Sequence, residues 1–348
     1  MATSVQLKNG TVVRVTERVL VHVDPDRDLH GPSTIRAANG DLLLCHQDSN
    51  AHRGGEGFVH QWRSTDNGFT WIDEGPVADW RDRELDALFG EYGLAPDGSL
   101  VMVVQRRQVL TADQGVIAAW LQTSTDHGKT WQELGAVDDS DEYAVMFGRG
   151  PVTKDDTMYF GAWSRLGNAL YHSTDGGRSW ERRSVIFPKD HPDFRALEEA
   201  GPPFYPHVIW CPDGTMLALT FSTPPRNHCY SRRSNDCGQS WGDIVEEKEL
   251  PLWAPRMRRL DDQTLIATGR DIELGATVAW FSTDSGNTWD HKLVVDKPAF
   301  TGSYAYSDSI DAGDGRFWVF TSSPQSEGKG DIIGVLLAVA PQAGAGGG

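Results

Sequence analysis

An octapeptide that recurs five times is the feature of this sequence that most constrains its fold. Each copy reads Ser-x-Asp-x-Gly-x-Ser/Thr-Trp, and successive copies begin 60, 49, 61 and 48 residues apart. We expect the Asp side chain to accept hydrogen bonds from backbone N–H groups, the Gly to supply a positive φ, and the Trp to pack under a hairpin. A turn repeated at this period predicts repeated antiparallel units. The copies occupy residues 64–71, 124–131, 173–180, 234–241 and 282–289.

A second repeat gives the number of units. Six hairpin turns are each followed by an apolar strand, and their second residues lie 58, 58, 58, 49 and 52 residues apart. The turns are Asn39-Gly40, Asp97-Gly98, Asp155-Asp156, Asp213-Gly214, Asp262-Gln263 and Asp314-Gly315. Six hairpins against five octapeptides leave the last unit to be completed by the C-terminal strand IIGVLLAVA and by an N-terminal strand around TVVRVTERVLVHV.

The predicted fold is therefore all-β, a six-bladed β-propeller with four-stranded antiparallel blades, closed by pairing of the N- and C-terminal strands. We expect a single domain over residues 1–341 and a disordered tail over residues 342–348, which end in AGAGGG.

Composition excludes several classes of partner. The net charge of −17 disfavours a nucleic-acid surface, because phosphate binding needs clustered Lys and Arg. No stretch has the run of apolar residues that a membrane span needs, and the first twenty residues lack the pattern of a secretory leader. The four cysteines show no metal-ligand spacing, so free thiols and a cytoplasmic location are expected. The oligomeric state stays open.

The octapeptide is the Asp box, or BNR repeat, and its five copies over nearly the whole chain make the sequence resemble the sialidase superfamily of six-bladed propellers. This resemblance is strong evidence for the fold. It is weaker evidence for activity, because Asp boxes lie on the blade periphery and also occur in non-catalytic propellers.

The register of the repeats predicts where a site would form. The innermost strand of each blade begins near the propeller axis, so residues at one offset before the six turns should converge at one mouth. Seven residues before each turn's second residue, every unit has a polar or charged side chain, which favours a binding site over an apolar core. These residues are Ser33, Glu91, Arg149, His207, Arg256 and Asp308. Nine residues before it lie Gly31, Phe89, Phe147, Tyr205, Ala254 and Tyr306.

The second strands should return to the same mouth with Asp48, Arg106 and Arg270, and the following loop should add His52. Arginines close to carboxylates shift one another's pKa values, as is common where acid–base chemistry occurs. The same pattern is equally typical of an ion-pair network that only joins the blades, and a water-filled channel also tolerates polar side chains.

The resemblance implies roles for particular residues. The segment AYSDS at 305–309 is similar to the segment that carries the sialidase nucleophile, which points to Tyr306, and Arg270 in GRDIELGA is similar to an arginine that binds the substrate carboxylate. The family's Arg-Ile-Pro-Ser segment reads His30-Gly31-Pro32-Ser33 here, and Tyr205-Pro206-His207 stands where the partner Glu is expected.

These observations predict an exo-acting, sialidase-like glycoside hydrolase for a terminal anionic sugar. Tyr306 would act as nucleophile or acid, and the leaving oxygen would be protonated by Asp48 or His52, with Glu56 from the same segment as a further candidate. The other predicted catalytic residues are Glu91, His207 and Asp308. The predicted substrate-binding residues are Arg270, Arg256, Arg149, His30, Arg106, Tyr205 and Trp253, the last because its ring could stack on a sugar.

Two other functions remain open. The histidines His30, His52 and His207 suit a polysaccharide lyase that acts by β-elimination at a uronate. Loss of the family's Glu and arginines suits a non-catalytic carbohydrate-binding propeller. No cofactor is predicted. His46, His52 and His60 lie on one blade, but strand alternation and the absence of a recognised ligand spacing argue against a metal site.

Overall fold

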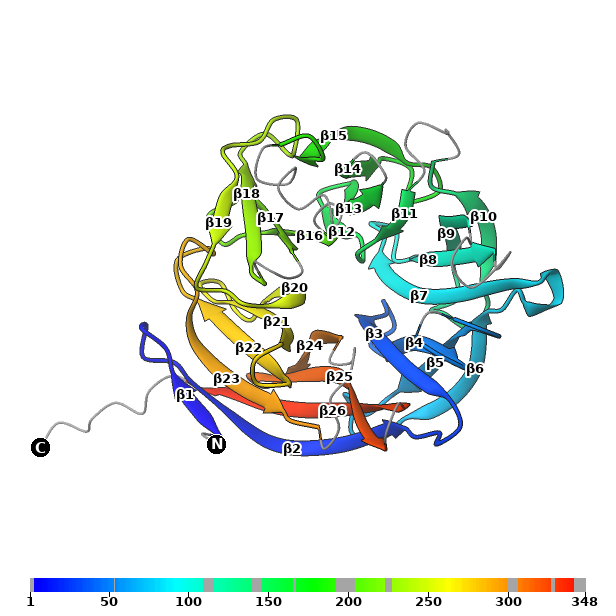
Figure 1. The fold of residues 1–348 in the computed structure, drawn as a ribbon, viewed down its shortest axis with the longest axis horizontal. Coiled ribbons are helices and arrows are strands. Elements are labelled where there is room, and N and C mark those ends of the chain that lie inside the picture. Colours follow the sequence, from blue (N-terminus) through cyan, green and yellow to red (C-terminus); the bar gives the residue numbers. More distant parts are fainter. Residues whose placement is uncertain are drawn as a thin grey trace, which may run out of the picture.

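The computed structural model describes residues 3–52, 54–108, 116–138, 145–164, 167–191, 204–222, 227–298, 306–326 and 329–340. Six antiparallel sheets surround one axis, with β3, β7, β11, β12, β16, β20 and β24 innermost (Figure 1). The predicted six-bladed, all-β propeller is confirmed. The tail over residues 342–348 lies outside the described residues.

Blades one to three each run outward from an inner strand. In chain order their strands are β3 (Asp28–Arg36), β4 (Leu42–Ser49), β5 (Phe58–Ser64) and β6 (Ile72–Ala78); β7 (Leu85–Leu94), β8 (Leu100–Gln108), β9 (Val116–Ser124) and β10 (Gln132–Ala136); and β11 (Val145–Gly148), β12 (Val152–Lys154), β13 (Thr157–Ser164), β14 (Gly167–Ser173) and β15 (Glu181–Pro188). The inner strand of blade three is interrupted, since β11 and β12 both pair with β13.

Blades four and five repeat this order, and blade six closes the ring. Their strands are β16 (Phe204–Trp210), β17 (Met216–Phe221), β18 (Cys229–Ser234) and β19 (Val245–Glu247); β20 (Trp253–Arg259), β21 (Leu265–Asp271), β22 (Ala276–Ser282) and β23 (Asp290–Asp296); and β24 (Ser307–Gly313), β25 (Arg316–Ser326), β26 (Lys329–Ala340), β2 (Val12–His22) and β1 (Ser4–Gln6).

Closure pairs the two ends of the chain as the sequence predicted. Strand β2 runs antiparallel to β26, with Val13 opposite Val339 and Leu20 opposite Ile333. The N-terminal strand therefore becomes the fourth strand of the last blade, and β26 loses the free edge that would otherwise pair with other chains.

The Asp boxes form the turns between the third and fourth strands of blades one to five. In the first box, Asp66 Oδ1 accepts hydrogen bonds from the backbone N–H groups of Phe69 and Thr70 at 3.1 and 2.9 Å, and Oδ2 accepts one from the Thr70 hydroxyl at 2.6 Å. Trp71 Nε1 donates to the carbonyl of Gly68 at 3.0 Å, and Gly68 has a φ of +96°. The expected roles of Asp, Gly and Trp in this turn are confirmed.

A register shift interrupts the inner strand of several blades at one offset before the hairpin turn. The pairing shifts between His30 and Ser33 in β3, and between Trp253 and Arg256 in β20. The shift recurs in β7 and β16. Gly31, Tyr205 and Ala254 occupy the same position in three blades and all have positive φ. Such bulges re-aim side chains, so the strand no longer alternates strictly at the axis.

The core is divided among the interfaces between neighbouring blades, where apolar side chains of the second and third strands pack together. The four cysteines are free. Within the described residues the helical content is one 3-10 turn, Arg81–Arg83, and no helix there could cross a membrane.

Candidate active site on the propeller axis

The charged residues seven positions before the turns lie at the axis and pair with one another. We call Glu91, Arg149, Arg256 and Asp308 the ion ring. Arg149 Nη1 lies 3.3 Å from Glu91 Oε1, Arg256 donates to the same oxygen, and Arg256 Nη1 lies 3.5 Å from Asp308 Oδ2. Each of these four side chains is at most 2% exposed. The sequence register therefore brings these residues together, in a buried layer.

The same register position also joins neighbouring blades through backbone hydrogen bonds. Asp308 Oδ2 of blade six accepts the N–H of Thr34 in blade one at 2.8 Å, and His207 Nδ1 of blade four accepts the N–H of Met257 in blade five at 2.9 Å. Ser33 Oγ accepts the N–H of the second blade's Tyr92 at 3.2 Å. These contacts join neighbouring blades. This is the alternative to a substrate site that the sequence pattern also allowed.

Burial and neighbouring charges fix the protonation of this layer. Burial raises the pKa of Asp308, but Arg258 and Arg256 outweigh it and lower the pKa to about 2. Burial, followed by the charges of Arg256, Arg258 and Arg149, holds the pKa of His207 well below its usual value. His207 is therefore neutral and bonded to the backbone, which suits positioning better than acid–base catalysis.

The layer retains a positive charge. Arg258 Nη2 lies 3.2 Å from Asp308 Oδ2. Among the described residues, the ion ring and Arg258 therefore contain three guanidinium groups against two carboxylates, Glu91 and Asp308. The side chain of Arg258 is 30% exposed, so solvent screens part of this excess charge.

Aromatic and imidazole rings gather beside the ion ring, and we call His30, His52, Phe89, Tyr205 and Tyr306 the axial cluster. The ring of Tyr306 lies 5.3 Å from Phe89 and 5.8 Å from both His30 and His52, measured between centroids. The guanidinium of Arg149 lies 5.2 Å from the centre of the Tyr205 ring. The positions nine before the turns thus supply much of this cluster; the side chain of Phe147 is outside the described residues.

Asp28 is a member of this site that sequence reasoning missed. Its Oδ1 lies 3.2 Å from Nδ1 of His30, and both side chains are buried. The other nitrogen of His30, Nε2, is buried without a hydrogen-bond partner among the described residues. His30 stacks on His52 at a centroid separation of 4.4 Å. A carboxylate that holds one imidazole nitrogen orients the other for proton transfer. The signal was the spacing Asp-x-His at the start of the first inner strand.

Tyr306 is a neutral phenol in this environment. Burial, followed by the neighbouring Tyr205, raises its pKa, while Arg149 and Arg270 oppose that rise. Arg270 lies 5.6 Å from the ring centre of Trp253 and forms no salt bridge with a described residue. Of the three arginines expected to hold a carboxylate, Arg270 is thus the one whose charge is not already paired, since Arg149 and Arg256 are bonded to Glu91.

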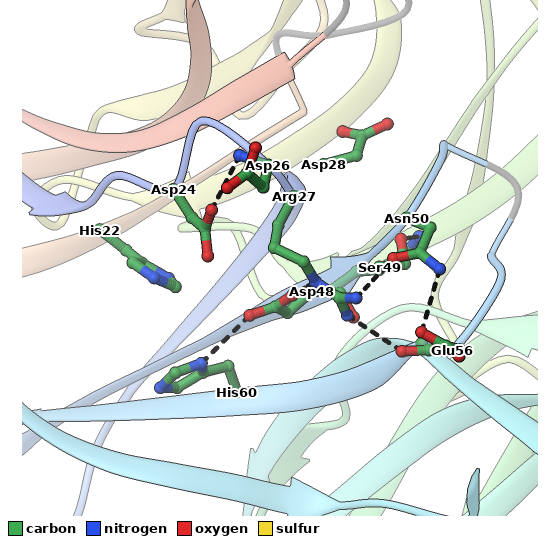
Figure 2. Close-up of polar contacts among 12 residues, drawn as sticks. His22, Asp24, Asp26, Arg27, Asp28, Asp48, Ser49, Asn50, Glu56 and His60 are labelled. Carbon is green, nitrogen blue, oxygen red and sulfur yellow. Dashed lines mark hydrogen bonds and ion pairs between the residues drawn. The ribbon is translucent and has the colours of Figure 1, made fainter.

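Asp48 lies in a different polar network (Figure 2). Arg27 Nε donates to Asp48 Oδ1 at 2.5 Å, and His60 Nδ1 lies 3.4 Å from Oδ2. Burial raises the pKa of Asp48, but these bonds from His60 and Arg27 outweigh it and lower the pKa. An ionised, bonded carboxylate cannot supply a proton at neutral pH, so this environment does not suit the acid role expected for Asp48.

Two further predicted residues lie away from the axial cluster. Arg106 stacks on Trp120, with its guanidinium carbon 3.5 Å from the ring centre, because Trp120 is its diagonal neighbour on strand β9. Glu56 lines a surface pocket of about 610 Å³ whose other walls are charged. The remaining lining residues are Asp79, Arg81, Asp82 and Arg83.

Among the described residues, two groups of side chains could hold a metal ion. One is Asp28, His30 and His52 of the axial site, and the other is His22, His46 and His60. The sequence argument against a metal considered one strand at a time. His46 and His60 are directly opposite each other on β4 and β5 and so share a face, whereas His52 joins the axial cluster.

Fold and site together define an Asp-box propeller with a polar, aromatic site on its axis. The model of the BNR repeat-like domain family matches residues 40–319. The chain belongs to this family. No curated protein matches it.

Solved structures with similar folds include a Dyadobacter fermentans protein of unknown function, at 16% identity and a TM-score of 0.80, with 94% of this chain and 99% of that one covered. A Hadza microbial sialidase is 14% identical, with a TM-score of 0.69 and coverage of 90% and 66%. An α-L-arabinofuranosidase from Fusarium graminearum is 14% identical, with a TM-score of 0.64 and coverage of 92% and 97%. At these identities the likeness shows the fold, and it confirms the resemblance to sialidase-like propellers.

Proposed function

We propose that this chain is a sialidase-like glycoside hydrolase that removes a terminal anionic sugar at the axial cluster. The observation that carries the proposal is the position of Tyr306, which has the Asp28–His30 pair and His52 on one side and is influenced by the cations of Arg149 and Arg270. Sialidase and arabinofuranosidase propellers among the similar structures support a glycosidase.

The charge distribution supports an anionic substrate. Arg270 is available to a carboxylate, and the ion ring with Arg258 adds an excess positive charge nearby. Guanidinium groups hold carboxylates in two parallel hydrogen bonds, which gives both energy and orientation. Trp253, beside Arg270, offers an apolar face to the sugar ring.

In the proposed reaction, the Tyr306 oxygen bonds to the anomeric carbon as the glycosidic C–O bond breaks. His30, held by Asp28, accepts the phenol proton, and His52 donates a proton to the leaving oxygen. Water then cleaves the tyrosyl–sugar bond and the protons return, so one water is consumed for each sugar released. Two displacements at one carbon retain the anomeric configuration.

The test is mass spectrometry of products from a panel of sialylated, uronate-bearing and neutral glycans. We expect fragments whose summed mass includes one water, obtained from an anionic glycan. Tyr306→Phe should lower kcat by about 10³-fold, because the nucleophilic oxygen is lost. Arg270→Ala should lower kcat/KM by about 10–100-fold for the anionic sugar, because a bond to a charged group is lost.

Arg106→Ala is the matched control for the arginine variant, since its guanidinium stacks on Trp120 outside the axial cluster. It should leave turnover within about twofold of the parent protein, as surface changes distant from a site usually do. Full turnover in both Tyr306→Phe and Arg270→Ala would contradict the assignment.

One observation favours a second function, a polysaccharide lyase. An imidazole oriented by a carboxylate beside a neutral phenol is a base–acid pair suited to β-elimination at a uronate. Products that lack the added water and absorb in the ultraviolet as unsaturated uronates would establish this reaction. No product from any glycan would instead favour a non-catalytic carbohydrate-binding propeller.

A further inference from the structure

Three histidines meet where the N-terminal strand packs against the first blade. His22 is the last residue of β2, which belongs to the sheet of blade six, whereas His46 and His60 lie on β4 and β5 of blade one. Figure 2 shows the His22 ring directed toward His60 and Asp48. We call His22, His46 and His60 the histidine triad. Its members come from two blades and from segments that no local repeat connects.

The spacing of the triad suits a single metal ion. One ligand atom from each residue lies within 4.8 Å of the other two. Nδ1 of His22 and Nε2 of His46 are 3.1 Å apart. Two imidazole nitrogens on one tetrahedral zinc ion are separated by about 3.3 Å, given Zn–N bonds of about 2.0–2.1 Å.

The contacts of His46 indicate that Nε2, the nitrogen that faces His22, is the one able to bind a metal. Its Nδ1 faces the backbone carbonyl of Gln47 at 2.9 Å and so carries the proton, which leaves the lone pair on Nε2. Metal-binding histidines characteristically donate their second ring nitrogen to a carbonyl or carboxylate in this way. The side chain of His46 is fully buried.

Without a cation, the contact between His22 and His46 is poorly satisfied. Nε2 of His46 already faces the indole N–H of Trp62 at 3.2 Å. If His22 Nδ1 carries a proton, two donors compete for one lone pair. If it does not, two lone pairs face each other at 3.1 Å. A cation bound by both nitrogens would remove the repulsion between their lone pairs, and it would replace the Trp62 N–H as the partner of His46 Nε2.

His60 supplies the third ligand together with nearby negative charge. Its two ring nitrogens contact Asp48 Oδ2 at 3.4 Å and Asp73 Oδ1 at 2.7 Å. Binding a metal exchanges one of these contacts for the ion and keeps the other as the carboxylate that orients the ring. The carboxylates also offset the charge of a divalent ion.

We propose that the histidine triad is a zinc site that joins the N-terminal strand β2 to the first blade, with Asp48 or a water molecule as the fourth ligand. The site is independent of the proposed glycosidase activity. It would strengthen the closure of the propeller, where the two ends of the chain meet, and would hold the segment between His22 and Asp28 that leads into the axial site.

The test is metal binding by the full-length protein after treatment with a chelator. Titration with Co²⁺ should give the visible absorption of a tetrahedral site, and Zn²⁺ should displace Co²⁺ with one ion per chain. Added Zn²⁺ should raise the Tm, because an ion that binds only the folded state stabilises it. In His22→Ala, and separately in His60→Ala, Zn²⁺ affinity should fall at least about tenfold, and the Tm shift at the same Zn²⁺ concentration should become smaller.

Two control variants make the result specific. His172→Ala removes a histidine of blade three that contacts the backbone of Glu181, and it should keep both Co²⁺ absorption and the Tm shift. His52→Ala removes the other group able to hold a metal and should also keep both. Absence of saturable binding, unchanged Zn²⁺ affinity in His22→Ala and His60→Ala, or binding lost in His52→Ala alone would overturn the proposal.

Discussion

The Asp-box turns at the periphery and the ion ring on the axis both use one position in successive blades, but they use it in opposite ways. Each box repeats the same residues and satisfies them locally: Asp66 and Asp126 both bond to a backbone N–H four residues ahead at 2.9 Å. The axial position carries a different side chain in most blades. Its bonds run between blades, as from Asp308 to Thr34, 274 residues away.

This difference shows how a repeat protein can keep a uniform frame and still build an individual centre. A local turn costs little chain entropy to close, so one motif can be copied without regard to its surroundings. The axial side chains stabilise the fold only together, because each buried charge needs a partner of opposite charge from another blade.

The largest effect is expected from breaking the axial set. Among the described residues, Arg256→Ala leaves Arg149 as the only cationic partner of Glu91 and Arg258 as the only cationic partner of Asp308, in a buried layer. The free energy of unfolding should fall by about 3–5 kcal/mol, the usual result of removing one partner of a buried pair. Chemical denaturation measures this loss. Arg258→Ala is the control, because its side chain is 30% exposed and solvent replaces part of the lost interaction. Equal losses of unfolding free energy in Arg256→Ala and Arg258→Ala would show that burial of the arginine does not control the effect.

A pH titration tests the contribution of one buried charge, that of Asp308, and we expect a smaller change in the free energy of unfolding than for Arg256→Ala. The pKa of Asp308 is about 2 in the folded protein, below the usual value of 3.8 for the unfolded chain. Its contribution is therefore fully present above pH 3.8 and is lost as the pH falls through 3.8 toward 2. That contribution is roughly 2 kcal/mol.

Asp308→Asn removes this titration. The difference in unfolding free energy between the parent protein and the variant should therefore shrink as the pH is lowered through this window. The comparison isolates Asp308 from the Asp-box carboxylates, which titrate in both proteins. A difference that is constant from neutral pH to the acid limit would show that the Asp308 charge is not responsible.

The smallest effect is expected at the periphery. Asp66→Ala should cost about 1–2 kcal/mol, because it removes hydrogen bonds between a carboxylate and the backbone in an exposed turn. Asp126→Ala should cost the same within about 0.5 kcal/mol, since its turn is bonded identically. Asp262→Ala, in a hairpin turn with a fully exposed carboxylate, is the control and should be nearly neutral. Unequal effects of the two box variants would show that blade context, rather than the local turn, controls them.

Much of the axial site could be located from the sequence but not interpreted from it. The offset of seven residues correctly brought Glu91, Arg149, Arg256 and Asp308 together. It could not show that they neutralise one another, because pairing depends on side-chain reach across blades. It also missed Asp28, since the bulge after His30 breaks the alternation on which the register was based. Asp48 and Arg106 were expected at the mouth because they lie on second strands, yet Asp48 bonds to Arg27 and Arg106 stacks on Trp120.

The sequence by itself determined the blade number, the position of each turn and the pairing of the chain ends, because those features follow from short segments whose backbone chemistry repeats. Tertiary structure alone decided which charged side chains pair with one another between blades, as Arg256 does with Glu91 and Asp308. It also decided that His22 meets His46 and His60. These outcomes depend on distances between residues far apart in the chain, and such distances exist only after the propeller has closed.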